Sequence, residues 1–98
     1  MKIETTKNGT EMTVRLEGRL DASTAPELSQ ELRANYDDIT DLTLDLEGLE
    51  YISSAGLRVL LEAHKTMSGK GTMTVLNVNG VLREIFEATG FSNILNIQ

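Results

Sequence analysis

Strand-like and helix-like spacings of apolar residues alternate along this chain, and that alternation limits the folds open to it. Segments 2–7 and 11–17 are typical of two strands joined at Asn8-Gly9, a dipeptide suited to the positive φ angles of a tight hairpin. The later segments alternate between helix and strand, which implies parallel pairing of the strands after the first hairpin. The expected helices are 24–36, 54–68 and a third between a cap at Asn79 and a C′ residue at Gly90, and the expected strands are 41–46, 72–78 and 94–97.

Each predicted strand has only one apolar face. Leu42, Leu44 and Leu46 alternate with polar residues, whereas a parallel sheet covered on both faces would show continuous apolar strands. The helices should therefore lie mainly on one face, and right-handed crossovers then place the strands in the order 1-2-3-4-5. The expected fold is a two-layer α/β domain with a mixed five-stranded sheet, in which the first hairpin is antiparallel and the rest parallel.

Length and composition favour one small globular domain spanning residues 1–98. Apolar residues make up 40% of the chain, which is ordinary for a folded domain, and no linker interrupts it. The start lacks a secretory signal and no apolar run could span a bilayer, so we expect a soluble, cytoplasmic protein without membrane insertion. A formal net charge of -6 disfavours nucleic acid and favours a protein partner with a basic face.

The loops before the three helices should meet at the carboxyl ends of the parallel strands, where α/β proteins commonly bind ligands. Thr24 and Asn79 are expected to be helix caps, because Thr24-Ala25-Pro26-Glu27 matches a capping box. Asp21 precedes that box and is not required as its N-cap; as an isolated residue it fits a solvated loop. The polar residues expected at this edge are Asp21, Ser23, Thr24, Glu47, Glu50, Ser53, Ser54, Asn77 and Asn79.

The sequence offers no catalytic site. His64 is the one histidine, and it follows Ser54 by ten residues on the same predicted helix, roughly 15 Å away, so a serine nucleophile would lack its base. The carboxylate pairs lack metal-ligand spacing, the chain has no cysteine, and Gly69-Lys70-Gly71 lacks the spacing of a phosphate loop. We therefore expect neither an enzyme nor a bound metal or cofactor.

Ser53 and Ser54 stand where the second helix begins, and two interpretations are open. Serine is a preferred N-cap because its oxygen accepts a hydrogen bond from an amide of the first turn. A helix start also carries unpaired N–H groups and the positive end of the macrodipole, so a phosphoryl group on such a serine would be held there.

Two motifs carry a family resemblance. Segment 16–21, Leu-Glu-Gly-Arg-Leu-Asp, and the more specific segment 44–60 around Ser53-Ser54-Ala55-Gly56-Leu57 resemble anti-sigma-factor antagonists of the STAS family. The resemblance implies that the unmodified protein binds an anti-sigma factor, often also its serine kinase, and so frees a sigma factor. Phosphorylation of the loop serine reverses that binding, and a dedicated phosphatase restores it.

The family's phosphorylated serine stands two residues before the Gly-Leu pair, which is Ser54 here. Ser53 replaces the aspartate that usually precedes it and is the alternative acceptor. A STAS interaction module of a transporter or signalling assembly without phosphorylation is the alternative function, and a small hydrolase lacks its base. The residues expected to contact the partner are Asp21, Ser23, Thr24, Glu50, Ser53, Ser54, Gly56 and Arg58.

Overall fold

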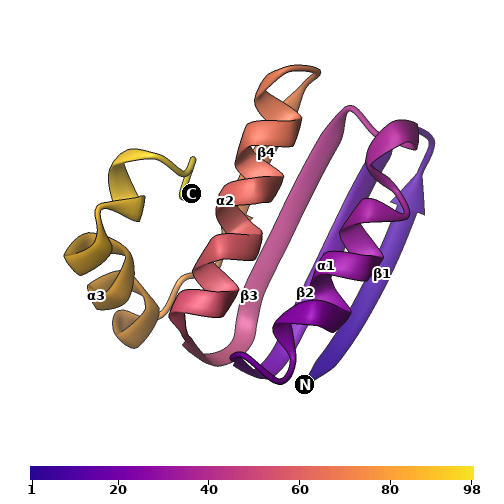
Figure 1. The fold of residues 1–98 in the computed structure, drawn as a ribbon. Helices are drawn as coiled ribbons and strands as arrows, with labels where there is room; N and C mark the ends of the chain where they lie inside the picture. Colours follow the sequence, from indigo (N-terminus) through magenta and orange to yellow (C-terminus); the bar gives the residue numbers. More distant parts are fainter.

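The computed structural model describes all residues 1–98. An initial hairpin of two strands is followed by three α-helices that alternate with two further strands (Figure 1). The strands are β1 (Lys2–Asn8), β2 (Glu11–Leu20), β3 (Asp41–Ile52) and β4 (Thr72–Leu76). The α-helices are α1 (Ala25–Arg33), α2 (Ser54–Ser68) and α3 (Gly80–Thr89), and two 3-10 helices, η1 (Tyr36–Asp38) and η2 (Phe91–Asn93), complete the chain.

The sheet order is β1-β2-β3-β4, with β1 and β2 antiparallel and the other neighbours parallel. This order confirms the predicted one-directional progression of the sheet. The predicted hairpin is present, but Asn8 pairs with Glu11, so the two-residue loop is Gly9-Thr10 and not the predicted Asn8-Gly9. Gly9 adopts the left-handed φ of +63° that such a loop requires.

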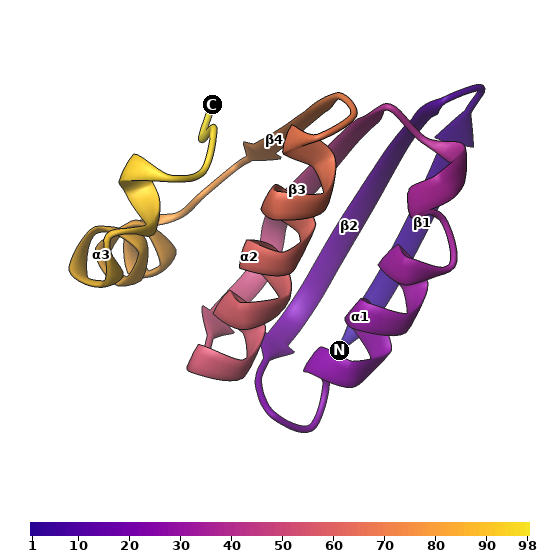
Figure 2. The ribbon, with the colours of Figure 1, turned by 45° about the horizontal axis from the view of Figure 1, so that its top comes forward.

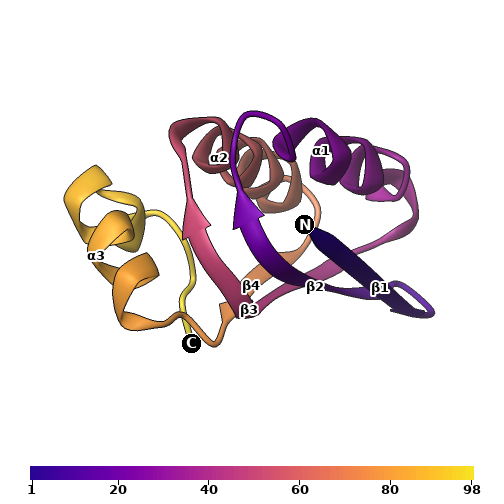
Figure 3. The ribbon, with the colours of Figure 1, turned by 90° about the horizontal axis from the view of Figure 1, so that it is seen from below.

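The helices cover one face of the sheet, as the single apolar face of each strand predicted. Figure 3 shows α1 and α2 side by side above the sheet, while α3 lies at the end of the molecule farthest from β1. All 23 residues of the buried cluster are apolar, and they include Leu42, Leu44 and Leu46 of β3. Thr43 and Asp45, between them, stay partly exposed on the opposite face.

The predicted fifth strand at 94–97 is wrong. Residues 91–93 form η2, and Leu95 N still donates to Phe91 O at 2.9 Å, so the chain is extended only at its last residues. A single parallel bridge joins Ile97 to Val75, and Ile94 remains 42% exposed. The sheet therefore has four strands.

β3 is longer than predicted and continues past Leu46 to Ile52. The pairing of β2 with β3 shifts register between Arg15 and Glu17 and again between Gly18 and Arg19. Leu46, Leu49 and Ile52, three residues apart, are consequently all buried, although a regular strand would turn alternate residues inward. The extension carries β3 to the edge of the sheet and places Ser53 directly after it.

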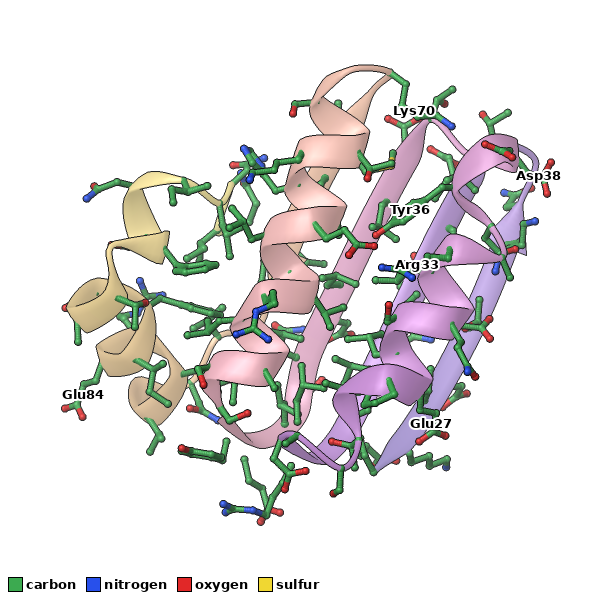
Figure 4. The ribbon with its side chains drawn as sticks, in the orientation of Figure 1. Glu27, Arg33, Tyr36, Asp38, Lys70 and Glu84 are labelled. Atoms are coloured by element: carbon green, nitrogen blue, oxygen red, sulfur yellow. The ribbon has the colours of Figure 1, made fainter.

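A contact between two connecting segments fixes one end of the helical layer. α1 ends at Arg33, three residues earlier than expected, and Tyr36 is buried in η1. The Lys70 ammonium donates to the backbone oxygen of Tyr36, which ties the α2–β4 loop to η1 at one end of the layer (Figure 4). None of the helices combines the length and the apolar character needed to cross a membrane.

Candidate functional site

Two loops meet at the carboxyl ends of β2 and β3. Leu20 and Ile52, the last residues of these strands, are paired, and Ser53 N donates to Leu20 O at 2.9 Å. Figure 2 shows the β2–α1 connection and the start of α2 at the same end of the sheet. The structure thus brings the Asp21 loop beside the serine loop, as the topology predicted.

The two serines have different environments. Ser53 is the N-cap residue of α2, with extended backbone (φ −94°, ψ 177°), but its side chain makes no capping hydrogen bond. Its Oγ is buried and has no hydrogen-bond partner. Ser54 is the first residue of α2 and is exposed. The two hydroxyls, which the sequence leaves as alternative acceptors, therefore differ in their exposure to solvent.

Gly56 allows the first turn of α2 to lie against the end of the sheet. It is buried, and a Cβ added there would lie 2.7 Å from Leu20 Cγ and 2.8 Å from Ile52 Cγ1. Both distances are too short for a side chain to be accommodated without movement of the core. Gly56 therefore supports the site from beneath and offers no surface to a partner.

The carboxylate of Asp21 has a local structural role that the sequence analysis missed. Its Oδ1 accepts hydrogen bonds from Ser23 Oγ at 2.7 Å, Ser23 N at 3.0 Å and Thr24 N at 3.3 Å. These bonds, chiefly that from the Ser23 hydroxyl, lower the pKa of Asp21. An aspartate that folds its loop in this way is the signature of an Asx turn, and the Asp-x-Ser-Thr order could have indicated it.

Thr24 is the N-cap residue of α1, as predicted, but the capping box is wrong because its side chain makes no capping bond, whereas the predicted cap at Asn79 is confirmed. Thr24 Oγ1 accepts from Asp21 N and donates to Arg19 O, both at 2.9 Å, and makes no bond to the amides of α1. Asn79 Oδ1 accepts from Leu82 N at 2.9 Å, and its Nδ2 donates to Leu49 O at 2.9 Å. Asn79 thus starts α3 and ties it to β3 near the site.

Glu50 and Arg58 complete the exposed side of the edge. Glu50 is exposed near the end of β3, and Arg58 is exposed one helical turn after Ser54. A hollow of about 260 Å³ opens between α1 and α2, with Arg58 and Ala55 on one side and Ala22 and Pro26 on the other. The site is therefore an open surface, and the hollow between α1 and α2 begins at Ala55, next to Ser54 in the sequence.

Glu47 and Asn77 belong to the outer face of the sheet. Asn77 Nδ2 donates to Asp45 Oδ1 at 2.8 Å, and Glu47 N donates to the same oxygen at 3.1 Å. Arg15 Nε lies 3.4 Å from Asp45 Oδ2. The Asn77 bond is the main cause of the lowered pKa of Asp45. These contacts link β2, β3 and the residue that follows β4, and none of them includes a residue of the serine loop.

Comparison with known proteins identifies the family. A family model described as "Mlab, STAS domain" matches residues 3–96. The chain belongs to the STAS domain family. The curated relatives of this STAS domain include BtrV of Bordetella bronchiseptica, named an anti-sigma factor antagonist, which is 38% identical over 84 residues, or 84% of this chain and 72% of BtrV. The anti-sigma-B factor antagonist of Staphylococcus aureus is 29% identical, with 99% of this chain and 92% of that protein covered.

Solved structures share the fold. The unphosphorylated form of the anti-sigma factor antagonist SpoIIAA aligns with a TM-score of 0.86 at 17% identity, covering 99% of this chain and 88% of that one. The phosphorylated form of SpoIIAA from Bacillus aligns at 0.79 and 17% identity, covering 99% and 91%.

Two polar groups stand out at this edge of the STAS domain. Ser54 offers an exposed hydroxyl at a helix start, and ionised Asp21 lies in the neighbouring loop. The structure contains no group of three or more His, Cys, Asp or Glu side chains arranged to hold a metal ion.

Proposed function

We propose that this STAS domain is an anti-sigma factor antagonist. In its unmodified form it binds an anti-sigma factor that is also a serine kinase, and a sigma factor is thereby freed. The names of the curated relatives support the class of function. The contact surface is the exposed edge built by Asp21, Ser23, Thr24, Glu50 and Arg58 around the two serines, with Gly56 beneath it.

Phosphorylation of Ser54 switches the domain off. The kinase transfers the γ-phosphoryl group of ATP to Ser54 Oγ, the hydroxyl proton passes to a base of the kinase, and ADP leaves. A phosphatase later hydrolyses the phosphoester and restores the hydroxyl. The existence of a phosphorylated form of the structurally similar SpoIIAA supports this cycle.

The observation that carries the choice of acceptor is the difference in exposure between the two serines. Ser54 is exposed, whereas the Oγ of Ser53 is buried. A kinase needs to align the acceptor oxygen with the transferred phosphoryl group, and a buried oxygen cannot be reached without opening the start of α2.

Inhibition follows from charge. A phosphate adds about two negative charges at pH 7. Asp21 and Glu50 already lie at this edge of a chain with net charge -6. A partner that binds this surface is matched to that negative charge, and a phosphate exceeds it. Truncating or mismatching a buried charge at an interface typically costs about 2–5 kcal/mol.

Phosphosite mapping tests the proposal. The wild-type chain, Ser54→Ala and Ser53→Ala are incubated with the candidate kinase and ATP, then analysed by intact mass and peptide mapping. We expect one phosphate on the wild type and on Ser53→Ala, and none on Ser54→Ala. Phosphate found on Ser53 alone would show that the acceptor is misassigned. A chain that binds its partner but takes up no phosphate would instead indicate an interaction module without the switch.

A further inference from the structure

One face of α2 carries a hydroxyl, a cation and an anion in sequence. Ser54, Arg58 and Glu62 are spaced four residues apart, so they lie along the same side of the helix. Glu62 is already engaged, because Arg33 of α1 donates to it from Nε at 2.8 Å and from Nη2 at 2.9 Å. Figure 4 shows the Arg33 side chain between α1 and α2.

Arg58 is left without an anionic partner. It is exposed and takes part in none of the four ion pairs of the structure. Its obvious neighbour on the helix, Glu62, is occupied by the bidentate bond from Arg33. Arg58 borders the hollow between α1 and α2 together with Ala55, the residue that follows Ser54.

The other cations considered are either engaged by another side chain or far from Ser54 along the helix. The guanidinium of Arg19 stacks on the ring of Tyr51, 4.5 Å from its centroid, on neighbouring strands of the sheet. Lys65 follows Ser54 by eleven residues on α2, roughly 16 Å along the axis. Arg58, by contrast, follows Ser54 by about 6 Å of helix rise.

We propose that Arg58 forms an ion pair with the phosphate of phosphorylated Ser54. The proposal rests on the proposed function for the site of modification, and it adds a residue that holds the modified state. An acidic group four residues before a basic one is the favourable orientation on a helix. Guanidinium also binds phosphate through two parallel N–H···O bonds.

The pair changes how the switch acts. In the unmodified chain the Arg58 guanidinium is free to contact an anionic group of the partner. Once Ser54 carries a phosphate, the same guanidinium is held by an anion of its own chain. Phosphorylation therefore adds negative charge to the surface, and it also engages the Arg58 guanidinium that would otherwise be free to contact the partner.

The ionisation of the phosphate tests the pair without any kinase or partner. Phosphoserine is installed at position 54 of the full chain by genetic encoding, and its second ionisation is followed by phosphorus NMR in the wild type, Arg58→Gln and Lys65→Gln. Because an adjacent cation favours the dianion, we expect the ionisation constant to be about two- to fivefold larger in the wild type than in Arg58→Gln. Lys65→Gln removes the same charge from the same helix and should match the wild type.

The salt dependence and the variant Arg58→Lys give two further tests of the ion pair. The difference between wild type and Arg58→Gln should shrink in 1 M NaCl, where the Debye length is about 3 Å. Arg58→Lys should lie between them, since it keeps the charge but loses the bidentate geometry. Equal constants in wild type and Arg58→Gln, or an equal loss in Lys65→Gln, would overturn the pair. Neither result would bear on whether a kinase uses Ser54, which the mapping experiment decides.

Discussion

At the scale of single residues, the site shows how one backbone conformation serves different purposes. Ser53 and Asn79 are both N-caps with extended backbone, at ψ 177° in each case. Asn79 accepts a hydrogen bond from the first turn of its helix, whereas Ser53 Oγ is buried without a partner. A residue suited to capping by type therefore does not cap α2 through its side chain.

Alanine at these two positions should separate the roles. Ser53→Ala loses no hydrogen bond and removes a buried, unpaired oxygen, so its free energy of unfolding should change by less than about 0.5 kcal/mol. Asn79→Ala, the matched control, should lose about 1–2 kcal/mol because a true cap is removed. Urea denaturation of both variants measures this. A loss of more than about 1 kcal/mol in Ser53→Ala would show that its hydroxyl does stabilise the helix start.

The sequence predicted some of these residue roles and missed others. Register to Gly56-Leu57 was enough to propose Ser54, and Asn79 was identified from its type and position. The sequence analysis does not predict the hydrogen bonds of the Asp21 carboxylate, because it assigns Ser23 to the partner surface and Thr24 to a helix cap. Burial of a single Oγ could not be predicted, since it depends on how the serine loop meets Leu20.

At the scale of elements, the approach of α2 to the sheet positions the serine loop. The first turn of the helix is in contact with the ends of β2 and β3 through Gly56, where a Cβ would lie 2.7 Å from Leu20 Cγ. The hydroxyl of Ser54 is therefore carried by a helix start that is fixed against the core.

Gly56→Ala should destabilise the fold although alanine favours helices. Overpacking against Leu20 and Ile52 typically costs about 1–3 kcal/mol. Gly80→Ala is the matched control in the first turn of α3, because a Cβ there meets nothing within 4 Å. It should be neutral or stabilising by up to about 1 kcal/mol. Thermal denaturation compares the two, and equal stability of both variants would show that Gly56 is not needed for close packing.

Element order was predictable, but two boundaries were not. The helices after each strand follow from apolar spacing and turn residues, and α2 begins and ends as predicted. β3 was predicted too short because its apolar period of two breaks after Leu46, where the register shifts restore burial at Leu49 and Ile52. The segment 94–97 has the apolar residues of a strand, but the helical turn of η2 continues to Leu95, so only Ile97 pairs with Val75.

At the scale of the whole molecule, hydrogen-bonded carboxylates link stability to pH. The bidentate bond from Arg33 lowers the pKa of Glu62, the bond from Ser23 lowers that of Asp21, and the bond from Asn77 lowers that of Asp45. A carboxyl with a lower pKa in the folded state contributes stability that is complete above its unfolded value, 4.5 for Glu62. That contribution is lost as the pH falls from this value through the folded pKa.

Acid titration of the melting temperature should reveal the Glu62 contribution. The advantage of the wild type over Glu62→Gln should be full near pH 6 and should disappear progressively below pH 4.5. It should correspond to less than about 1 kcal/mol, because both side chains are substantially exposed. Parallel curves for the two proteins from pH 6 to about pH 2.5 would show that the Arg33–Glu62 contact does not stabilise the pairing of α1 and α2.

We propose above that a phosphate on Ser54 prevents partner binding. Titration calorimetry of a candidate anti-sigma factor, against the unmodified and the Ser54-phosphorylated chain, measures this effect. We expect binding of the unmodified chain and an affinity at least about 100-fold lower after phosphorylation, because the added charge is desolvated at the interface. Equal affinity of the two forms would contradict it.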